Sequence, residues 1–220
     1  MSATNIGLSL VVLRSVPLFA ALSESELEKL SRVSVRKRVE RTAFVVRAGD
    51  STDSLYILLT GRAKVTNTDE EGREIILAWL GPGEFFGEMG LIDGSPRSAN
   101  VVAVEACELL VLSKDAFQRC LQDNFQVAQK LMQILVRRLR EADRNIESLA
   151  LLDVYGRVAR LLLELSEEDG GRRIVKKKIS KQDMARMIGA SREMVSKVMR
   201  DLELSGYILC ENNQVIILGA

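Results

Sequence analysis

Four polar side chains near the carboxyl-terminal end of the sequence have types and spacing suited to contacting nucleic acid. Arg192, Glu193, Ser196 and Lys197 lie close enough in sequence to occupy two adjacent turns of one helix. An arginine can donate two hydrogen bonds to guanine O6 and N7, a glutamate can accept from the cytosine amino group, and a lysine can reach guanine or a phosphate. We therefore expect these residues to contact base edges in DNA.

The surrounding segment has the pattern of a helix-turn-helix. Ser180 is a good cap for a first helix over residues 181–188, and Gly189 supplies the left-handed turn that ends it. Ser191 caps a second helix that continues to about residue 204. The expected shared core consists of small and branched apolar residues: Ala185, Ile188, Val195, Val198 and Leu202.

The start of the first helix offers further contacts with DNA. Lys181 and Gln182 are expected to hold phosphates, which positions a protein without specifying sequence. Ser191 completes the predicted DNA-binding set. The alternative is a helical hairpin used for protein contacts.

The distribution of charge agrees with a nucleic-acid partner. The net charge is only +1, but residues 172–200 hold ten Lys and Arg against two acidic residues, a local balance of 10 − 2 = +8. Such a block is a localised electrostatic footprint. The alternative is a solvated charged face.

Cysteine and histidine usage excludes several classes of site. The three cysteines, Cys107, Cys120 and Cys210, are far apart, and the chain has no histidine. This pattern argues against a disulfide framework, a structural zinc, an iron–sulfur cluster and a haem or redox sensor, and it predicts buried free thiols and no metal. An enzyme is disfavoured as well, because no nucleophile and base occur at motif spacing.

The sequence gives no sign of a membrane segment. Residues 6–22 are apolar, but Arg14 and Pro17 interrupt them and no basic segment precedes them. We expect a cytoplasmic protein of ordinary globular composition, with 47% hydrophobic and 28% charged residues.

In the first half of the chain, the expected secondary structure changes from helix to short strands. Residues 13–39 carry helix signals that begin at Ser23. From residue 43 to 112, short apolar runs alternate with glycine-containing turns, which predicts a small antiparallel barrel or roll. The expected strands include residues 44–46, 55–59, 75–77 and 109–112.

Residues 114–152 lack glycine and proline and predict a short helix followed by a long one. A mostly apolar set recurs at spacings of three and four: Ala128, Leu131, Leu135, Arg138 or Leu139, Ala142, Asn145 or Ile146, and Leu149. This is coiled-coil spacing, and a two-fold dimer would cover a stripe that a small barrel leaves exposed. The alternative is that the stripe packs on the chain's own core.

The remaining segment contains the predicted helix-turn-helix and its flanks. We expect a helix over residues 154–166, a loop over 167–171 and a strand around Ile174. A terminal hairpin is expected to turn at Asn212 and Asn213.

Several motifs resemble the cyclic-AMP receptor protein family, the Crp/Fnr regulators. They are residues 83–91 (GEFFGEMGL), 96–99 (PRSA), 149–154 (LALLDV), 156–157 (GR) and 191–195 (SREMV). The resemblance implies an α+β fold with three parts. These are a cyclic-nucleotide-binding β-roll over residues 1–125, a long dimerisation helix over 126–152 and a winged helix-turn-helix over 153–220.

The same resemblance implies a nucleotide site. A short helix starting at Gly87 would point backbone N–H groups at an anion. Glu88 would accept from a ribose hydroxyl, while Arg97 and Ser98 would hold the cyclic phosphate. The full implied set is Phe86, Gly87, Glu88, Met89, Gly90, Arg97, Ser98, Arg138, Ala142 and Asp143, with Arg138 facing phosphate.

The base-contacting end of this site departs from the family pattern. Cyclic-AMP binders of the family use adjacent Thr and Ser, where this chain has Ala142 and Asp143. Asp143 could accept from the adenine amino group or from guanine N1–H and N2–H, or it could simply face water. Cyclic AMP is the leading ligand, with cyclic GMP and cyclic di-GMP as competitors.

The resemblance also implies how DNA is bound. A homodimer would present two helices to a palindrome whose half-site resembles TGTGA, with looser recognition at Lys197, where the nearest relatives have Arg. RNA polymerase is a further expected partner. The rival hypothesis is a nucleotide-binding module that acts through protein contacts without DNA.

Overall fold

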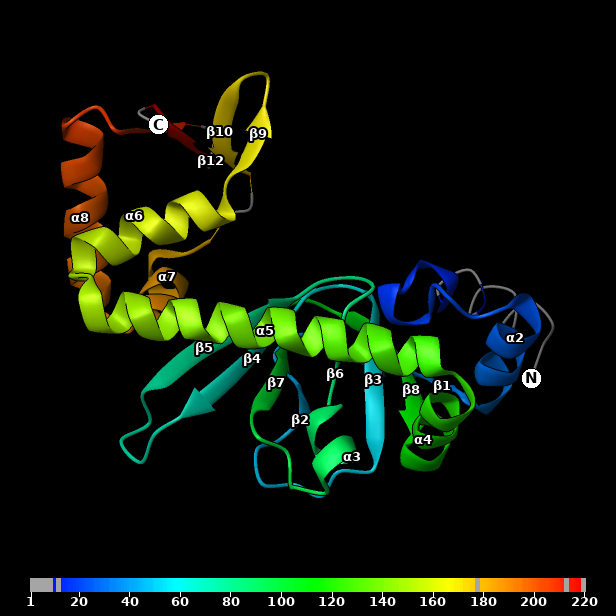
Figure 1. The fold of residues 1–220 in the computed structure, drawn as a ribbon. Helices are drawn as coiled ribbons and strands as arrows, with labels where there is room; N and C mark the ends of the chain where they lie inside the picture. Colours follow the sequence, from blue (N-terminus) through cyan, green and yellow to red (C-terminus); the bar gives the residue numbers. More distant parts are fainter. Residues whose placement is uncertain (1–9, 11–12, 177–178, 212–213, 219–220) are drawn as a thin grey trace. The chain divides into compact units, whose positions relative to one another are not determined.

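The computed structural model describes residues 10, 13–176, 179–211 and 214–218, and it divides into two compact units (Figure 1). The first is Met1–Arg138 and the second is Leu139–Ala220. The boundary falls within one long helix, α5 (Phe125–Leu151), and each unit is described by itself.

Two four-stranded antiparallel sheets form the body of the first unit. One sheet has the order β1-β8-β3-β6 and the other the order β2-β7-β4-β5. The strands are β1 (Val35–Val39), β2 (Phe44–Val46), β3 (Ser54–Thr60), β4 (Ala63–Thr68), β5 (Glu74–Leu80), β6 (Phe85–Phe86), β7 (Asn100–Ala103) and β8 (Cys107–Ser113).

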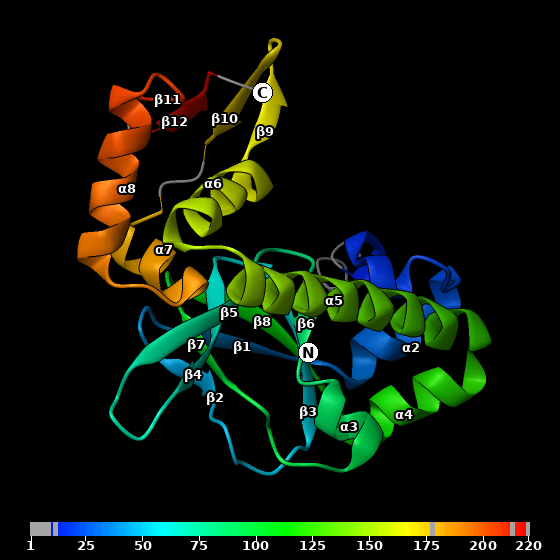
Figure 2. The same cartoon turned by 60° about the vertical axis from the view of Figure 1, so that its left-hand side comes forward.

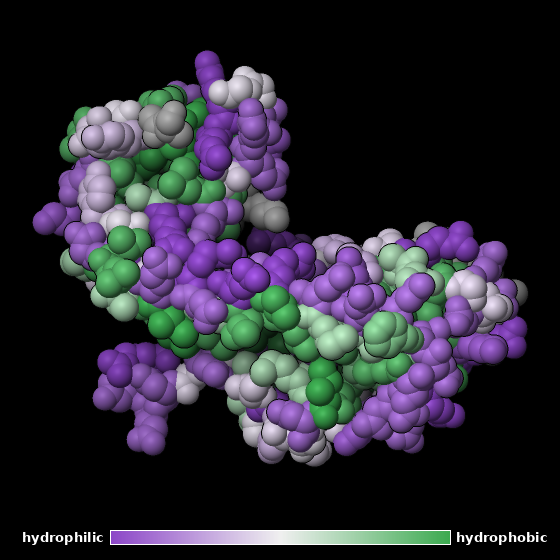
Figure 3. Space-filling view, viewed as in Figure 1, coloured by the Kyte–Doolittle hydropathy of each residue, from purple (hydrophilic) through white to green (hydrophobic). Residues whose placement is uncertain are grey.

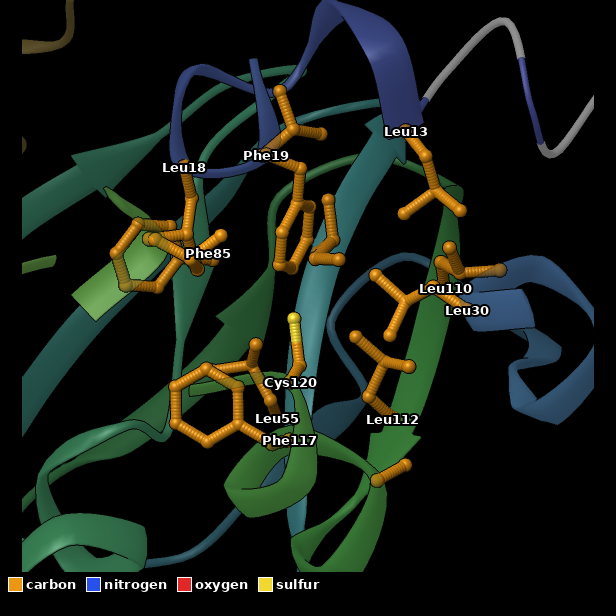
Figure 4. Close-up of a cluster of buried hydrophobic side chains, with 14 of the residues drawn as sticks. Leu13, Leu18, Phe19, Leu30, Leu55, Phe85, Leu110, Leu112, Phe117 and Cys120 are labelled. Carbon is orange, nitrogen blue, oxygen red and sulfur yellow. The ribbon is translucent and has the colours of Figure 1, made fainter. Parts of the chain in front are cut away.

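Strand β3 is buried on both faces, which explains its continuous apolar run. Leu55 and Ile57 belong to a cluster with the helices, whereas Tyr56 and Leu58 belong to a cluster with strands of the other sheet. Cys120 points into the first cluster (Figure 4), and burial is the main cause that raises the pKa of its thiol to about 11. The predicted buried thiols are confirmed at Cys107 and Cys120.

Helices cover the outer face of the β1-β8-β3-β6 sheet. They are η1 (Pro17–Phe19), α2 (Glu24–Val33), α4 (Lys114–Asp123) and the first turns of α5. The short helix α3 (Met89–Asp93) follows β6. A capping box between Ser23 and Glu26 begins α2, as the sequence predicts.

The carboxyl-terminal part of α5, three further helices and a third antiparallel sheet form the second unit (Figure 2). The helices are α6 (Val154–Leu165), α7 (Lys181–Ile188) and α8 (Arg192–Leu204). The sheet has the order β11-β12-β10-β9 and is made of β9 (Glu167–Asp169), β10 (Arg172–Val175), β11 (Ile208–Glu211) and β12 (Gln214–Ile217). Asn212 and Asn213 lie outside the described residues.

Three sequence predictions are wrong. Residues 35–39 form β1 rather than the end of a helical segment, because they pair with β8. The predicted loop over residues 167–171 contains β9, which pairs with β10 across Gly170 and Gly171. Cys210 is exposed, since it lies on the edge strand β11.

The predicted apolar stripe of α5 divides into a part that packs on the core and a part that is exposed. Leu131 is 4% exposed and packs with the core of the first unit, and Leu135 is partly buried against it. The later stripe members Leu139, Ile146 and Leu149 are exposed, as are Met132 and Val136, which the prediction did not include. In the space-filling view, hydrophobic surface runs along part of α5 (Figure 3).

The predicted α+β fold class is confirmed. The predicted bounds of the three domains stay predictions. No described helix is both long and apolar enough to cross a membrane.

Candidate functional sites: an anion loop and a helix-turn-helix

The loop between β6 and α3 depends on a glycine. Gly87 has a φ of +86°, a region that other residues rarely adopt. A Cβ atom there would collide with Nη1 of Arg97 and lie 3.1 Å from the Ser54 carbonyl oxygen. The helix begins at Met89 rather than at Gly87 as predicted, because Glu88 occupies the N-cap position.

Arg97 is fixed beneath this loop. Its side chain is 4% exposed, and it donates from Nη1 to the Gly87 carbonyl at 2.9 Å and from Nη2 to the Ser54 carbonyl at 2.7 Å. Asp53 lies 3.7 Å from Nη2. These two hydrogen bonds use two of the five N–H donors of a guanidinium, which leaves three for an anion.

Glu88 is a buried carboxylate that is neutralised by α5. It is 3% exposed, and its Oε1 accepts from Nη1 of Arg138 at 2.6 Å. Arg138 also donates to the Phe85 carbonyl at 2.8 Å and lies over the Phe85 ring, 4.9 Å from its centroid. Because a carboxylate has about four lone-pair sites, Glu88 keeps capacity to accept from a ligand hydroxyl.

The structure brings together part of the predicted nucleotide set. Gly87 is joined to Arg97, and Glu88 to Arg138, by the contacts above. The predicted phosphate contact of Arg138 stays a prediction. Phe86 is buried. Gly90 is close-packed, since a Cβ would collide with Ser95 and Thr52.

The remaining members of this set lie on exposed positions. Met89 and Ser98 are exposed, and the Ser98 hydroxyl lies 3.9 Å from the Met89 sulfur. Ala142 and Asp143 are exposed on α5 in the second unit. Among the described residues, no group of His, Cys, Asp or Glu is arranged to hold a metal ion.

Sequence reasoning missed the residues of β3 that act on Arg97. Ser54 contributes its backbone carbonyl, for which side-chain type gives no signal. Tyr56 contributes its ring, over which the guanidinium carbon of Arg97 lies 5.6 Å from the centroid. The one sequence signal for Tyr56 was that it is the only aromatic residue in the apolar run 55–59.

In the second unit, α7 and α8 are capped as predicted. The Ser180 hydroxyl accepts from the Asp183 backbone at 3.0 Å, and the Ser191 hydroxyl accepts from Met194 at 3.2 Å. Gly189 ends α7 with a φ of +62°. Arg157 donates to the Ile188 carbonyl at 2.8 Å, which satisfies one of the last carbonyls of that helix.

The inner face of the helix pair is buried and the outer face is polar. The predicted core residues Ala185, Ile188, Val195, Val198 and Leu202 are all buried in one cluster. On the outer face Lys181, Gln182, Ser191, Arg192, Glu193 and Lys197 are exposed and Ser196 is partly exposed.

Glu193 is held in its charged form. Its own backbone N–H and then the Ser191 hydroxyl lower the pKa of Glu193. An ionised carboxylate only accepts hydrogen bonds, as contact with a cytosine amino group requires.

The basic block is partly neutralised by strand β9, in the segment that was predicted to be a loop. Register places Asp169 opposite Arg172 and Glu168 opposite Arg173, and Lys176 lies 2.9 Å from Asp169. Extending the count to residue 167 adds three acidic residues, so the local balance falls to 10 − 5 = +5.

Two parts of the chain match known domain families. Residues 36–124 match the cyclic nucleotide-binding domain, and residues 156–219 match the Crp-like helix-turn-helix domain.

Curated relatives span nearly the whole chain. The CRP-like cAMP-activated global transcriptional regulator of Mycobacterium tuberculosis is 30% identical over 210 residues, which cover 94% of each chain. The cAMP-activated global transcriptional regulator CRP of Haemophilus influenzae is 35% identical over 184 residues, 80% of each chain.

Solved structures are similar as well. The c-di-GMP responsive global regulator CLP of Xanthomonas campestris has a TM-score of 0.75 and 29% identity, covering 90% of this chain and all of that one. The Thermus thermophilus catabolite activator protein has a TM-score of 0.56 and 34% identity over 92% of this chain and 93% of that one. With the two domain matches and the relatives above, these likenesses show that this chain belongs to the Crp/Fnr family of cyclic-nucleotide-binding transcription regulators.

Proposed function

We propose that the protein is a homodimeric regulator whose affinity for a palindromic DNA site is controlled by a cyclic nucleotide, with cyclic AMP as the leading effector. The observation that carries this proposal is the ion pair between Glu88 and Arg138, because it joins the ligand loop to the long helix. A ligand that engages Glu88 would also act on α5, and it would favour the dimer state to which it binds more tightly.

The phosphate end of the proposed site is Arg97 with Ser98, and the ribose end is Glu88. Arg97 retains three N–H donors for a phosphate, and charge-assisted hydrogen bonds of this type are strong. The names of the mycobacterial and Haemophilus relatives, which are cAMP-activated, support cyclic AMP.

The base end of the proposed site is Ala142 and Asp143. A carboxylate at Asp143 would accept one bond from adenine, or two in parallel from guanine N1–H and N2–H. The c-di-GMP responsive regulator among the similar structures supports cyclic di-GMP as an alternative effector, and the guanine-accepting geometry at Asp143 supports cyclic GMP as another.

The exposed stripe of α5 supports the dimer. Met132, Val136, Leu139 and Ile146 follow heptad spacing of four, three and seven, and each is at least half exposed. Asp143 lies between the last two. A second copy of α5 would remove this stripe from water, which is the main driving force for association.

On DNA, α8 would act as the recognition helix. Its amino-terminal residues Arg192, Glu193, Ser196 and Lys197 would meet base edges of a site related to TGTGA, while Lys181, Gln182 and Ser191 would hold the backbone. RNA polymerase is the further proposed partner.

The ligand loop gives a test with a matched control. Gly87 and Gly94 both have positive φ, +86° and +77°, so alanine carries a similar backbone cost at each, roughly 1–2 kcal/mol. Only at Gly87 would the new Cβ displace Arg97, since Gly94 has open space around it. In calorimetric titrations with cyclic AMP, cyclic GMP and cyclic di-GMP, we expect cyclic AMP to bind wild type most tightly.

Gly87→Ala should weaken nucleotide binding at least about tenfold, because the new Cβ displaces the Arg97 guanidinium that is proposed to bind the phosphate. Gly94→Ala should bind like wild type. Equal affinity of the two variants would contradict a role for Arg97 in holding the phosphate.

The stripe on α5 gives a test of the dimer. Leu139→Glu places a charge in the proposed interface, and burying an unpaired charge costs several kcal/mol, so we expect dissociation to increase by at least about a hundredfold. Asn145→Glu adds the same charge at an exposed position off the stripe and should leave the dimer intact. Sedimentation velocity measures whether each variant is a monomer or a dimer. A dimeric Leu139→Glu protein would contradict this interface.

The recognition helix gives a test of DNA reading. Arg192→Ala should lose about 1–3 kcal/mol of discrimination per half-site, the value of one bidentate arginine–guanine contact. Arg200→Ala removes the same charge from the far end of α8, where no base contact is proposed. Fluorescence anisotropy with a TGTGA palindrome and a scrambled duplex should show lost preference only for Arg192→Ala. Retained preference in that variant would favour a module that acts without DNA.

A further inference from the structure

Tyr56 sits at the centre of an aromatic and cationic stack beside the ligand loop. Its ring is stacked on the Phe86 ring, with centroids 5.2 Å apart and planes at 8°. The guanidinium carbon of Arg97 lies 5.6 Å from the centroid of the Tyr56 ring. Tyr56 and Phe86 are also cross-strand partners in the ladder between β3 and β6, so backbone pairing and ring stacking hold them in the same register.

The groups that hydrogen-bond or stack on Arg97 come from these two strands and the residue that follows one of them, and the exposed carboxylate of Asp53, just before β3, lies 3.7 Å from its Nη2. Ser54, two residues before Tyr56, supplies one carbonyl, and Gly87, directly after Phe86, supplies the other. The two carbonyls restrain the nitrogen atoms of the guanidinium, while the electron-rich face of an aromatic ring attracts the cation as a whole. Side-chain freedom of Arg97 is therefore removed before any ligand arrives.

The ring can serve this purpose because it is buried and neutral. Tyr56 is 8% exposed and Phe86 is 4% exposed, so the cation meets the ring in a site largely removed from water, where such contacts are strongest. Burial raises the pKa of the Tyr56 phenol, although Arg97 acts in the opposite direction. The phenol consequently stays protonated and adds no negative charge that would compete with an anionic ligand for Arg97.

We propose that Tyr56 is a positioning residue for the cyclic phosphate: it holds the Arg97 guanidinium so that its three unused N–H donors are ready for the anion. This inference rests on the proposed function, because it takes Arg97 as the phosphate-binding group. The role concerns the phosphate and not the base, so it applies equally to adenine and guanine nucleotides. Preorganisation of this kind raises affinity because less side-chain freedom is lost on binding.

The test compares three variants by calorimetry, with cyclic AMP and cyclic GMP as probes. Tyr56→Leu removes the ring and should weaken both nucleotides about tenfold, within the range of a buried cation–π contact. Tyr56→Phe keeps the ring and should retain affinity within about twofold of wild type. Leu58→Ala opens the same core cluster from the same strand and should leave nucleotide affinity unchanged, which controls for general loosening.

A double-mutant cycle with Arg97→Lys shows whether Tyr56 acts through the guanidinium. In the Arg97→Lys background, Tyr56→Leu should have less than about a twofold further effect. Additive effects would overturn the proposal, as would wild-type affinity of Tyr56→Leu for either probe. If Tyr56→Leu does not fold, Phe86→Leu replaces it, and we expect it to weaken nucleotide binding about threefold. Wild-type affinity of Phe86→Leu, or additive effects with Arg97→Lys, would then overturn the proposal. Failure of the wild type to bind any cyclic nucleotide would instead overturn the proposed function and this inference with it.

Discussion

A carboxylate removed from water is stable only when its charge is compensated, and the first unit satisfies this constraint at Glu88 with a residue 50 positions away. Arg138 brings that compensation from α5, and the same side chain donates to the carbonyl of Phe85. The ion pair therefore ties together the strand before the ligand loop, the cap of α3 and the long helix. Any ligand group that competes for the carboxylate must alter the interaction between the loop and α5.

In the rest of the ligand loop, two glycines let the backbone pack closely against neighbouring residues. Gly87 lets its own carbonyl face Arg97, and Gly90 lets α3 pass Thr52 and Ser95 without a Cβ atom between them. The supporting strand β3 is buried on both faces, so it offers a rigid base. A loop between a two-residue strand and a five-residue helix has little stability of its own, and its geometry comes from these neighbours.

The elements that sequence predicted well are those with local signals. Ser180, Gly189 and Ser191 mark the ends of α7 and α8 by their own side-chain or backbone chemistry, and the structure confirms each cap. Strands β1 and β9 were missed because their pairing depends on residues elsewhere in the chain. Strand β9 forms because its acidic residues pair with the basic strand β10, and the acidic residues alone do not predict this pairing. The first part of the predicted stripe on α5 packs on the core instead, because periodicity does not tell how far along the helix the core of the first unit extends.

The candidate nucleotide site was predictable as a set of residue types, since a glycine, a glutamate and an arginine at motif spacing indicate an anion loop. The contacts among them were not, because Ser54 acts through its backbone, Tyr56 acts through its ring, and the pairing of Arg138 with Glu88 joins residues far apart in the sequence. The central claim is that nucleotide binding and DNA binding are coupled in one molecule. Its most direct test is the affinity of the wild-type protein for a palindromic duplex, measured by anisotropy with and without each cyclic nucleotide. We predict tighter binding with one of them, cyclic AMP first, and equal affinity with and without every nucleotide would contradict this coupling.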